Sequence, residues 1–332
     1  MVAVVRPVKA EEAVGKPLAH DIVKYGPGLK AVLFKKGHMV REEDVEKLKD
    51  AGNYIVYIEE GELEGVHEDD AALRMATACM GQNLLHTKPN KGRVDLLASI
   101  SGVLRVKEAI VKEVNLVEDF VLATLPDFSG VRKGQRVASM KIVPLSVDEA
   151  RMREVEGILS REKPVVEVCT PVVKRIGAII TGTEIFEGRV KDAFFPVLQK
   201  KLGEFGLQIE ESCIMPDDER KIAEKIIEFK NSGKELILVC GGMAVDIKDV
   251  TASAIKLAGA DVVRRGIPAF PGSMMMISYL SDVAVVGLPA CVIPDERTTF
   301  DIFLPKLLMK RKIEREEIAD IAPRGLEILS GG

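Results

Sequence analysis

Between residues 174 and 306 the chain alternates short runs that are apolar at every position with amphipathic segments of helical period. A strand without a polar face is expected in a sheet that helices cover on both sides. Strands separated by helices can run parallel, because the crossover helix returns the chain to the edge where it started. We therefore predict an α/β domain with a mainly parallel sheet in this part of the chain.

The elements of this domain can be assigned from the pattern of apolar residues. The predicted strands are Arg175–Ile180, Leu207–Cys213, Leu236–Cys240 and Ala284–Val286. The predicted helices are Asp192–Phe205, Asp217–Asn231, Val250–Leu257 and Asp295–Leu308. Ligands of open parallel sheets lie outside the carboxyl ends of the strands, where helix N-termini supply N–H groups. Function is therefore expected in the turns that follow these strands.

The first such turn is Thr181-Gly182-Thr183-Glu184. Its glycine allows the backbone to approach a ligand, and its hydroxyls and carboxylate can hydrogen-bond a phosphate, a sugar or a ring N–H. Read alone, this turn is more typical of a plain strand-to-loop connection than of a ligand site. Asp192, at the expected start of the next helix, either caps that helix or holds Mg²⁺.

The second turn, Gly241-Gly242, follows the most apolar strand directly. Two glycines permit positive φ angles and remove the Cβ atoms that would block a flat ring or a phosphate. Asp249 follows at the start of the next predicted helix and is expected to face the same crevice as Asp192. Two convergent carboxylates are a recurrent way of holding a divalent cation against phosphate oxygens, although both could serve only as helix caps.

The third turn begins at Gly287, and Pro289 is expected to make it rigid. The nearby run of methionines at 274–276 is interpreted as a strand that fills the core, because methionine packs readily in apolar interiors.

Composition limits the remaining possibilities. No apolar run approaches the roughly 20 residues that span a bilayer, and the first residues lack a secretory pattern, so we expect a cytoplasmic protein without a membrane segment. A net charge of −4 and the absence of tryptophan argue against nucleic-acid binding. The five cysteines lack metal-ligand spacing and are expected to be free thiols.

The chain is expected to comprise four parts. Residues 1–65 form a small β-rich module with one helix that ends at Gly52, and residues 66–165 form an α+β module whose role the sequence does not reveal. The α/β domain occupies residues 170–310. Residues 311–332 are a tail that begins basic and becomes acidic, and we expect it to be loosely packed.

The ordered motifs of the α/β domain resemble the molybdopterin-binding domain family of molybdenum cofactor biosynthesis, which includes molybdopterin adenylyltransferase, molybdopterin molybdenumtransferase and gephyrin. The motifs are Thr181-Gly182-Thr183-Glu184, Asp192, Gly241-Gly242, Lys248-Asp249-Val250-Thr251 and Gly287-Leu288-Pro289. Several motifs in the same order are more specific than any one of them.

The resemblance implies a three-layer α/β sandwich that binds a pterin phosphate at the strand ends together with Mg²⁺. It implies cofactor-binding roles for Thr181, Gly182, Thr183, Glu184, Gly241, Gly242, Thr251, Gly287 and Pro289. It also implies that Asp192 and Asp249 are the metal-binding and catalytic pair.

The sequence departs from the family pattern at three places. Cys240 stands where the family usually has serine or threonine, and Ala290 stands where a glycine normally follows Leu-Pro. The segment 270–274, Phe-Pro-Gly-Ser-Met, replaces a lysine-bearing pattern of the molybdenumtransferase branch. Losing both lysines removes cations that would attract molybdate or phosphate. Binding is therefore better supported than turnover.

The sequence thus predicts a protein that binds molybdopterin, or a related pterin phosphate, in molybdenum cofactor biosynthesis or delivery. Its catalytic form would transfer an adenylyl group from ATP or insert the metal, with Mg²⁺. One alternative is a non-catalytic carrier or insertion chaperone that docks a molybdoenzyme or a biosynthetic partner. Another is a nucleotide-binding protein similar to nicotinamide-nucleotide amidases and pyrophosphatases. Relatives commonly self-associate, so a homo-oligomer is expected by analogy.

Overall fold

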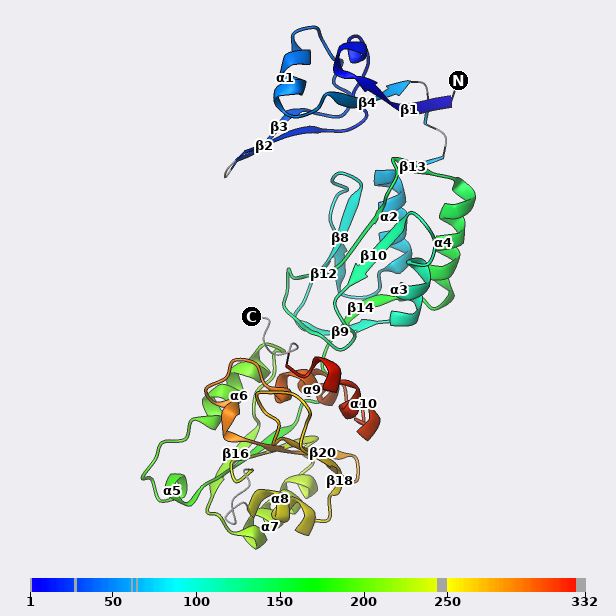
Figure 1. The fold of residues 1–332 in the computed structure, drawn as a ribbon. Coiled ribbons are helices and arrows are strands. Elements are labelled where there is room, and N and C mark those ends of the chain that lie inside the picture. Colours follow the sequence, from blue (N-terminus) through cyan, green and yellow to red (C-terminus); the bar gives the residue numbers. More distant parts are fainter. Residues whose placement is uncertain (1, 27–28, 61, 64, 244–249, 327–332) are drawn as a thin grey trace. The chain divides into compact units, whose positions relative to one another are not determined.

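The structure, a computed structural model, describes residues 2–26, 29–60, 62–63, 65–243 and 250–326 (Figure 1). Among these residues, no helix combines the length and hydrophobicity needed to cross a membrane. The chain divides into two compact units. Unit 1 comprises residues 1–99, 105–127 and 134–167, and unit 2 comprises residues 100–104, 128–133 and 168–332. Unit 2 contains all of the residues predicted to form the site.

The first part of unit 1 is small and built largely from strands. Its elements are β1 (Val2–Lys9), η1 (Ala10–Ala13), β2 (Ile22–Gly26), β3 (Leu29–Phe34), α1 (Asp44–Asp50), β4 (Ile55–Glu60) and β5 (Glu62–Leu63). Strand β1 lies between β4, to which it is antiparallel, and β5, while β2 and β3 form a separate antiparallel pair. Helix α1 ends before Gly52, whose φ of 81° confirms the helix end predicted there.

The remainder of unit 1 and its neighbouring segments are a mixture of strands and helices, as predicted. The elements are β6 (Val66–His67), α2 (Glu68–Cys79), β7 (Leu84–His86), β8 (Arg93–Ala98), β9 (Gly102–Val106), α3 (Glu108–Val114), β10 (Phe120–Thr124), β11 (Gly130–Val131), β12 (Arg136–Ile142), β13 (Ser146–Val147), α4 (Glu149–Arg161) and β14 (Val166–Cys169). The main sheet is antiparallel with the order β10-β12-β8-β7.

Unit 2 is built on a six-stranded sheet. Its elements after β14 are β15 (Ile176–Thr181), α5 (Thr183–Phe186), α6 (Phe194–Gly203), β16 (Glu211–Met215), α7 (Glu219–Asn231), β17 (Leu236–Cys240), α8 (Val250–Leu257), β18 (Asp261–Arg265), β19 (Met276–Leu280), β20 (Val283–Leu288), η2 (Ala290–Val292), α9 (Thr299–Leu308), α10 (Arg315–Asp320) and η3 (Ala322–Arg324). The strand order is β16-β15-β17-β20-β19-β18.

The sheet of unit 2 separates two hydrophobic cores. Its first four strands in spatial order are mutually parallel, and β19 and β18 are antiparallel to their neighbours. One face packs against α6, α9 and α10, and the other packs against α7 and α8 (Figure 1). Side chains alternate between the two cores along β17, where Leu238 joins the first and Val239 joins the second. The three-layer α/β sandwich with a mainly parallel sheet is therefore confirmed.

Several predictions about this unit are wrong in detail. The strand predicted at the methionine run 274–276 begins only at Met276, and the helix predicted from Asp295 begins only at Thr299. The strand predicted from Leu207 begins only at Glu211, because Leu207 and Ile209 pack into the core beneath α6 as irregular chain. The segment from 311 to 326 is not loosely packed, since Ile313 and Ile318 are fully buried.

Candidate functional site

The parallel strands bring four turns to one edge of the sheet. Ile180 is paired with Cys240, and Cys240 is paired with Leu288, so β15, β17 and β20 end at the same level. Thr181 is paired with Met215 of β16 on the other side. The turns that begin at residues 182, 216, 241 and 289 therefore share the carboxyl edge, where the sequence predicted a ligand site.

The diglycine turn requires glycine at both positions. Gly241 has a φ of 96° and Gly242 has a φ of 56°. Residues that carry a side chain rarely adopt these backbone conformations. A Cβ atom on Gly241 would lie 2.6 Å from the carbonyl oxygen of Thr181, and one on Gly242 would lie 2.8 Å from Oγ1 of Thr251. The two glycines thus allow the turn to lie directly against Thr181 and Thr251.

These two threonines are buried beneath the turn. Thr181 is 3% exposed and Thr251 is fully buried. The Thr251 hydroxyl donates to the carbonyl oxygen of Gly241 at 2.8 Å, and the Thr181 hydroxyl donates to that of Cys240 at 3.2 Å. Both were predicted to bind cofactor, but each hydroxyl is directed at the protein backbone.

Thr183 and Glu184 form the exposed part of the first turn. The backbone N–H and the hydroxyl of Thr183 donate to Oδ2 of Asp217 at 2.9 and 3.0 Å, and the Asp217 N–H donates back to Oγ1 of Thr183 at 3.2 Å. Gly182, with a φ of 149°, donates its N–H to the carbonyl oxygen of Met215. The turn after β15 is therefore tied to the turn after β16.

Asp217 is a candidate site residue that the sequence prediction missed. It was assigned only to the start of the following helix, although it also follows a strand of the parallel sheet. The neighbouring Asp218 is the true cap of α7, because its carboxylate accepts the N–H groups of Arg220 and Lys221. Two consecutive aspartates after a strand were the available signal that one of them serves another purpose.

Asp192 occupies the position expected of a helix cap. Its two carboxylate oxygens accept the N–H groups of Phe194 and Phe195 at 2.7 and 3.3 Å, at the start of α6. The Cys240 thiol lies at the end of β17, and its pKa is raised mainly by burial and secondly by the negative charge of Asp192. Asp249, its predicted partner, lies outside the described residues.

The third turn is less accessible. A Cβ atom on Gly287 would lie 2.8 Å from the sulfur of Met243, so this glycine makes room for a core side chain. Pro289 is buried as well. Nearby, the Thr299 hydroxyl donates to the carbonyl oxygen of Gly272 at 2.7 Å, which fastens the loop that replaces the lysine-bearing pattern to the start of α9.

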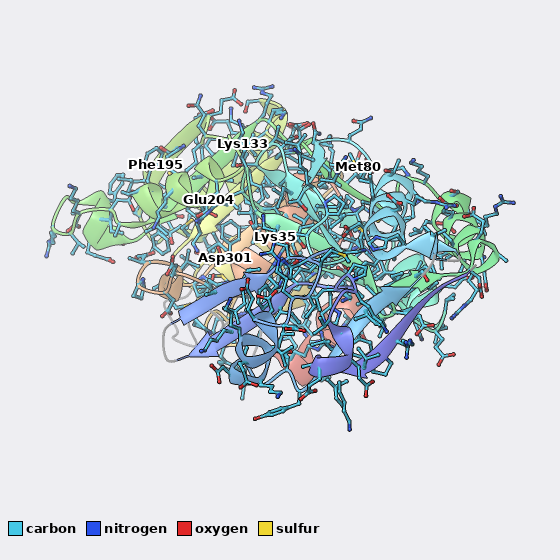
Figure 2. The ribbon with its side chains drawn as sticks, turned by 90° about the horizontal axis from the view of Figure 1, so that it is seen from above. Lys35, Met80, Lys133, Phe195, Glu204 and Asp301 are labelled. Atoms are coloured by element: carbon cyan, nitrogen blue, oxygen red, sulfur yellow. The ribbon has the colours of Figure 1, made fainter. Side chains whose placement is uncertain are left out.

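A buried lysine between α6 and α9 is already neutralised. The Nζ atom of Lys201 donates to both carboxylate oxygens of Asp301, at 2.7 and 2.9 Å, and to the carbonyl oxygen of Glu296 at 2.7 Å (Asp301 is labelled in Figure 2). Lys201 is only 8% exposed. It therefore links the two helices and does not compensate for the cations missing from the loop.

The described residues do not assemble a metal centre. Across the ranges given above, no group of three or more histidine, cysteine, aspartate or glutamate side chains is placed to hold a metal ion. Both oxygens of Asp192 already accept backbone N–H groups. The described donors therefore do not fit a Mg²⁺ ion by themselves.

Comparison with known proteins gives two family matches. A model described as a probable molybdopterin binding domain matches residues 177–310, and a domain of unknown function (DUF8806) matches residues 7–60. Among curated proteins, a CinA-like protein of Mycobacterium avium is 31% identical over 94 residues, which are 28% of this chain and 22% of that protein. A CinA-like protein of Mycobacterium leprae is 32% identical over 84 residues, 25% of this chain and 20% of that protein.

The matches therefore span about a fifth of the length of these curated relatives. Among solved structures, CinA from Thermoplasma acidophilum, a protein with unknown function, is 15% identical with a TM-score of 0.36, covering 41% of this chain and 98% of its own. A tungsten cofactor synthesizing protein, MoaB, from Pyrococcus furiosus is 17% identical with a TM-score of 0.32, covering 47% of this chain and 98% of its own.

Proposed function

We propose that unit 2, whose residues 177–310 form a domain of the molybdopterin-binding family, binds molybdopterin or a closely related pterin phosphate in molybdenum cofactor biosynthesis or delivery. The observation that carries the proposal is the convergence of the turns at 182–184, 216–218 and 241–242 on the carboxyl edge of the parallel sheet. Such an edge is where open α/β sheets bind phosphorylated ligands.

The residues divide into two groups by their accessibility. The exposed Thr183, Glu184 and Asp217 can contact the ligand directly, because a hydroxyl and carboxylates match the hydroxyl and N–H groups of a pterin. Gly242 offers its backbone N–H group, and Gly241, whose N–H donates to the carbonyl oxygen of Leu288, allows the turn to approach the strand ends because it has no Cβ atom. Thr181, Thr251, Gly287 and Pro289 support these groups from beneath, and this indirect role is the one we propose for them.

The catalytic form of the proposal depends on Asp249. Adenylyl transfer from ATP, or insertion of the metal, with Mg²⁺ would require the Asp249 carboxylate to complete the donor set that Asp192 begins. We propose that Asp192 and Asp249 act together in this way. In the carrier alternative, unit 1 docks a molybdoenzyme or a biosynthetic enzyme and no turnover occurs.

The nucleotide alternative is the second one that the sequence left open. It would require unit 2 to bind a nicotinamide nucleotide at the same edge. The family model over residues 177–310 supports the pterin instead.

Binding and turnover can be separated in one set of experiments. Purified protein is titrated anaerobically with molybdopterin, followed by pterin fluorescence, and parallel samples contain MgATP, molybdate, or both. Saturable binding without an adenylylated product or inserted metal supports the carrier, whereas product formation that Asp249→Asn abolishes supports catalysis. Failure to bind the pterin, with saturable binding of nicotinamide mononucleotide in its place, would overturn the proposal.

A further inference from the structure

Two buried hydroxyl groups meet where the first turn, the diglycine turn and helix α8 come together. Oγ1 of Thr181 and Oγ1 of Thr251 are 3.3 Å apart. Each hydroxyl has only one proton to donate. The shortest contact, 2.8 Å to the carbonyl oxygen of Gly241, takes the proton of Thr251. Thr181 can then donate to the carbonyl oxygen of Cys240 or to Oγ1 of Thr251.

The hydroxyl of Thr251 joins helix α8 to a separate segment of the chain. A threonine so near the start of its helix has no carbonyl oxygen three or four residues earlier within that helix. Thr251 is the second residue of α8, and its hydroxyl crosses to a carbonyl ten residues earlier, in the turn after β17. The hydroxyl therefore fixes a separate segment and does not merely satisfy its own helix.

This bond fixes the orientation of one peptide group. Gly241 is held on both sides, since its N–H donates to the carbonyl oxygen of Leu288 at 3.0 Å and its carbonyl oxygen accepts from Thr251. In a trans peptide the carbonyl oxygen and the following N–H point in opposite directions. With the Gly241 carbonyl directed inward at the buried Thr251, the N–H of Gly242 is directed away from α8.

We propose that Thr251 is a positioning residue, whose hydroxyl holds the Gly241–Gly242 peptide so that the Gly242 N–H is presented to the anionic group of the ligand. Backbone N–H groups in turns with positive φ angles are well suited to bind phosphate. A methyl group in place of the hydroxyl leaves the Gly241 carbonyl without this donor, and the peptide is then free to rotate. The proposal rests on a phosphate-bearing ligand for unit 2 and adds the residue that prepares its site.

Three variants of the full chain test this role. Thr251→Val removes the hydroxyl at nearly constant shape, and Thr251→Ser retains it. Ser278→Ala is the matched control, because the Ser278 hydroxyl is also fully buried and donates to a backbone carbonyl, that of Val285 at 2.6 Å, within the same sheet. Ser278 lies on β19, where it is paired with Val285 of β20.

Two readouts are needed so that the role of Thr251 can be judged separately from the identity of the ligand. The first is the amide resonance of Gly242 in protein labelled at glycine with ¹⁵N, titrated with inorganic phosphate. The second is the molybdopterin affinity. Thr251→Val should suppress the phosphate-induced shift of Gly242 and weaken pterin binding about tenfold, or about 1.4 kcal/mol. Thr251→Ser and Ser278→Ala should both remain within about twofold of the wild type.

The possible results distinguish the positioning role of Thr251 from the proposal that unit 2 binds a pterin. A Gly242 shift with phosphate that Thr251→Val abolishes, without any pterin binding, supports the positioning role and refutes the pterin proposal. The positioning role is overturned by an unchanged response in Thr251→Val, by equal losses in Ser278→Ala, or by a wild-type Gly242 resonance that ignores phosphate and pterin. If Thr251→Val does not fold, the wild-type resonance and Thr251→Ser still decide the question, since a lack of response in either refutes the role.

Discussion

Replacing Gly241 by alanine should destabilise unit 2 far more than the same change at Gly188, whose φ is also positive. Moving a side chain into such a conformation costs roughly 1–2 kcal/mol. The new Cβ atom would also lie 2.6 Å from the carbonyl oxygen and 2.9 Å from the hydroxyl of Thr181. Thr181 ends a central strand and cannot easily move, so overpacking adds about 1–3 kcal/mol. The expected loss is therefore about 3 kcal/mol.

Gly188 provides the matched comparison. Its φ is 74°, and no atom lies within 4 Å of the position that a Cβ atom would take. Gly188→Ala should therefore cost only the conformational part, about 1 kcal/mol. Both residues belong to unit 2, so the difference between the two variants isolates the steric contact with Thr181.

Hydrogen exchange measured by mass spectrometry gives a local readout in a chain of more than one unit. Amides of β15 and β17 that exchange through unfolding of unit 2 should exchange on the order of 100-fold faster in Gly241→Ala than in the wild type. The reasoning is refuted if Gly241→Ala and Gly188→Ala exchange at the same rate in these strands.

Three further predictions concern other parts of the chain. Cys240 should resist alkylation at pH 8 until the protein is denatured, because burial and the charge of Asp192 raise the pKa of its thiol; mass spectrometry of the alkylated peptides measures this. Burial alone would raise the pKa of Asp44, but hydrogen bonds led by that from His38 lower it, so its stabilisation is present above about pH 4 and is lost as the pH falls further. Asp44→Asn should cost about 2 kcal/mol at pH 7 and little in acid, as judged by hydrogen exchange in α1. Ile318→Ala should cost about 2–4 kcal/mol and accelerate exchange in β19, whereas an unchanged rate would mean that the C-terminal segment is not part of the core.

The central elements of unit 2 could be predicted because local pattern and tertiary environment agree there. Strand β17 and helix α8 have the predicted bounds, Leu236–Cys240 and Val250–Leu257. A strand buried on both faces is apolar at every position, and the diglycine that follows fixes its end. Asp192 was placed at the N-cap and lies one residue before it, but its carboxylate accepts the first helical N–H groups as a cap would, since such an interaction is local.

Other elements depend on contacts that the sequence does not reveal. Strand β18 was not predicted, and β19 is antiparallel to β20, because the direction of a strand is decided by its connection and its partner. The apolar Leu207 and Ile209 were assigned to a strand, but their burial comes from packing beneath α6. Burial of an apolar residue does not by itself distinguish a strand from an irregular segment.

The candidate site also combines features that local sequence predicts with features that depend on distant contacts. The glycine-bearing turns were found from sequence, because a positive φ limits the choice of residue. The tie between Thr183 and Asp217 joins residues that are 34 positions apart, and no local pattern encodes it. Nor can sequence tell whether a threonine at a strand end, such as Thr181, directs its hydroxyl at a ligand or at the backbone.

The most direct test of the proposed function is a hydrogen-exchange footprint of molybdopterin on the full chain. With the pterin bound, amides of residues 181–184 and 240–243 should exchange more slowly, while those of unit 1 should be unaffected in a chain without partners. Protection confined to other segments, or no protection at saturating pterin, would contradict the assignment of the carboxyl edge of this sheet as the binding site.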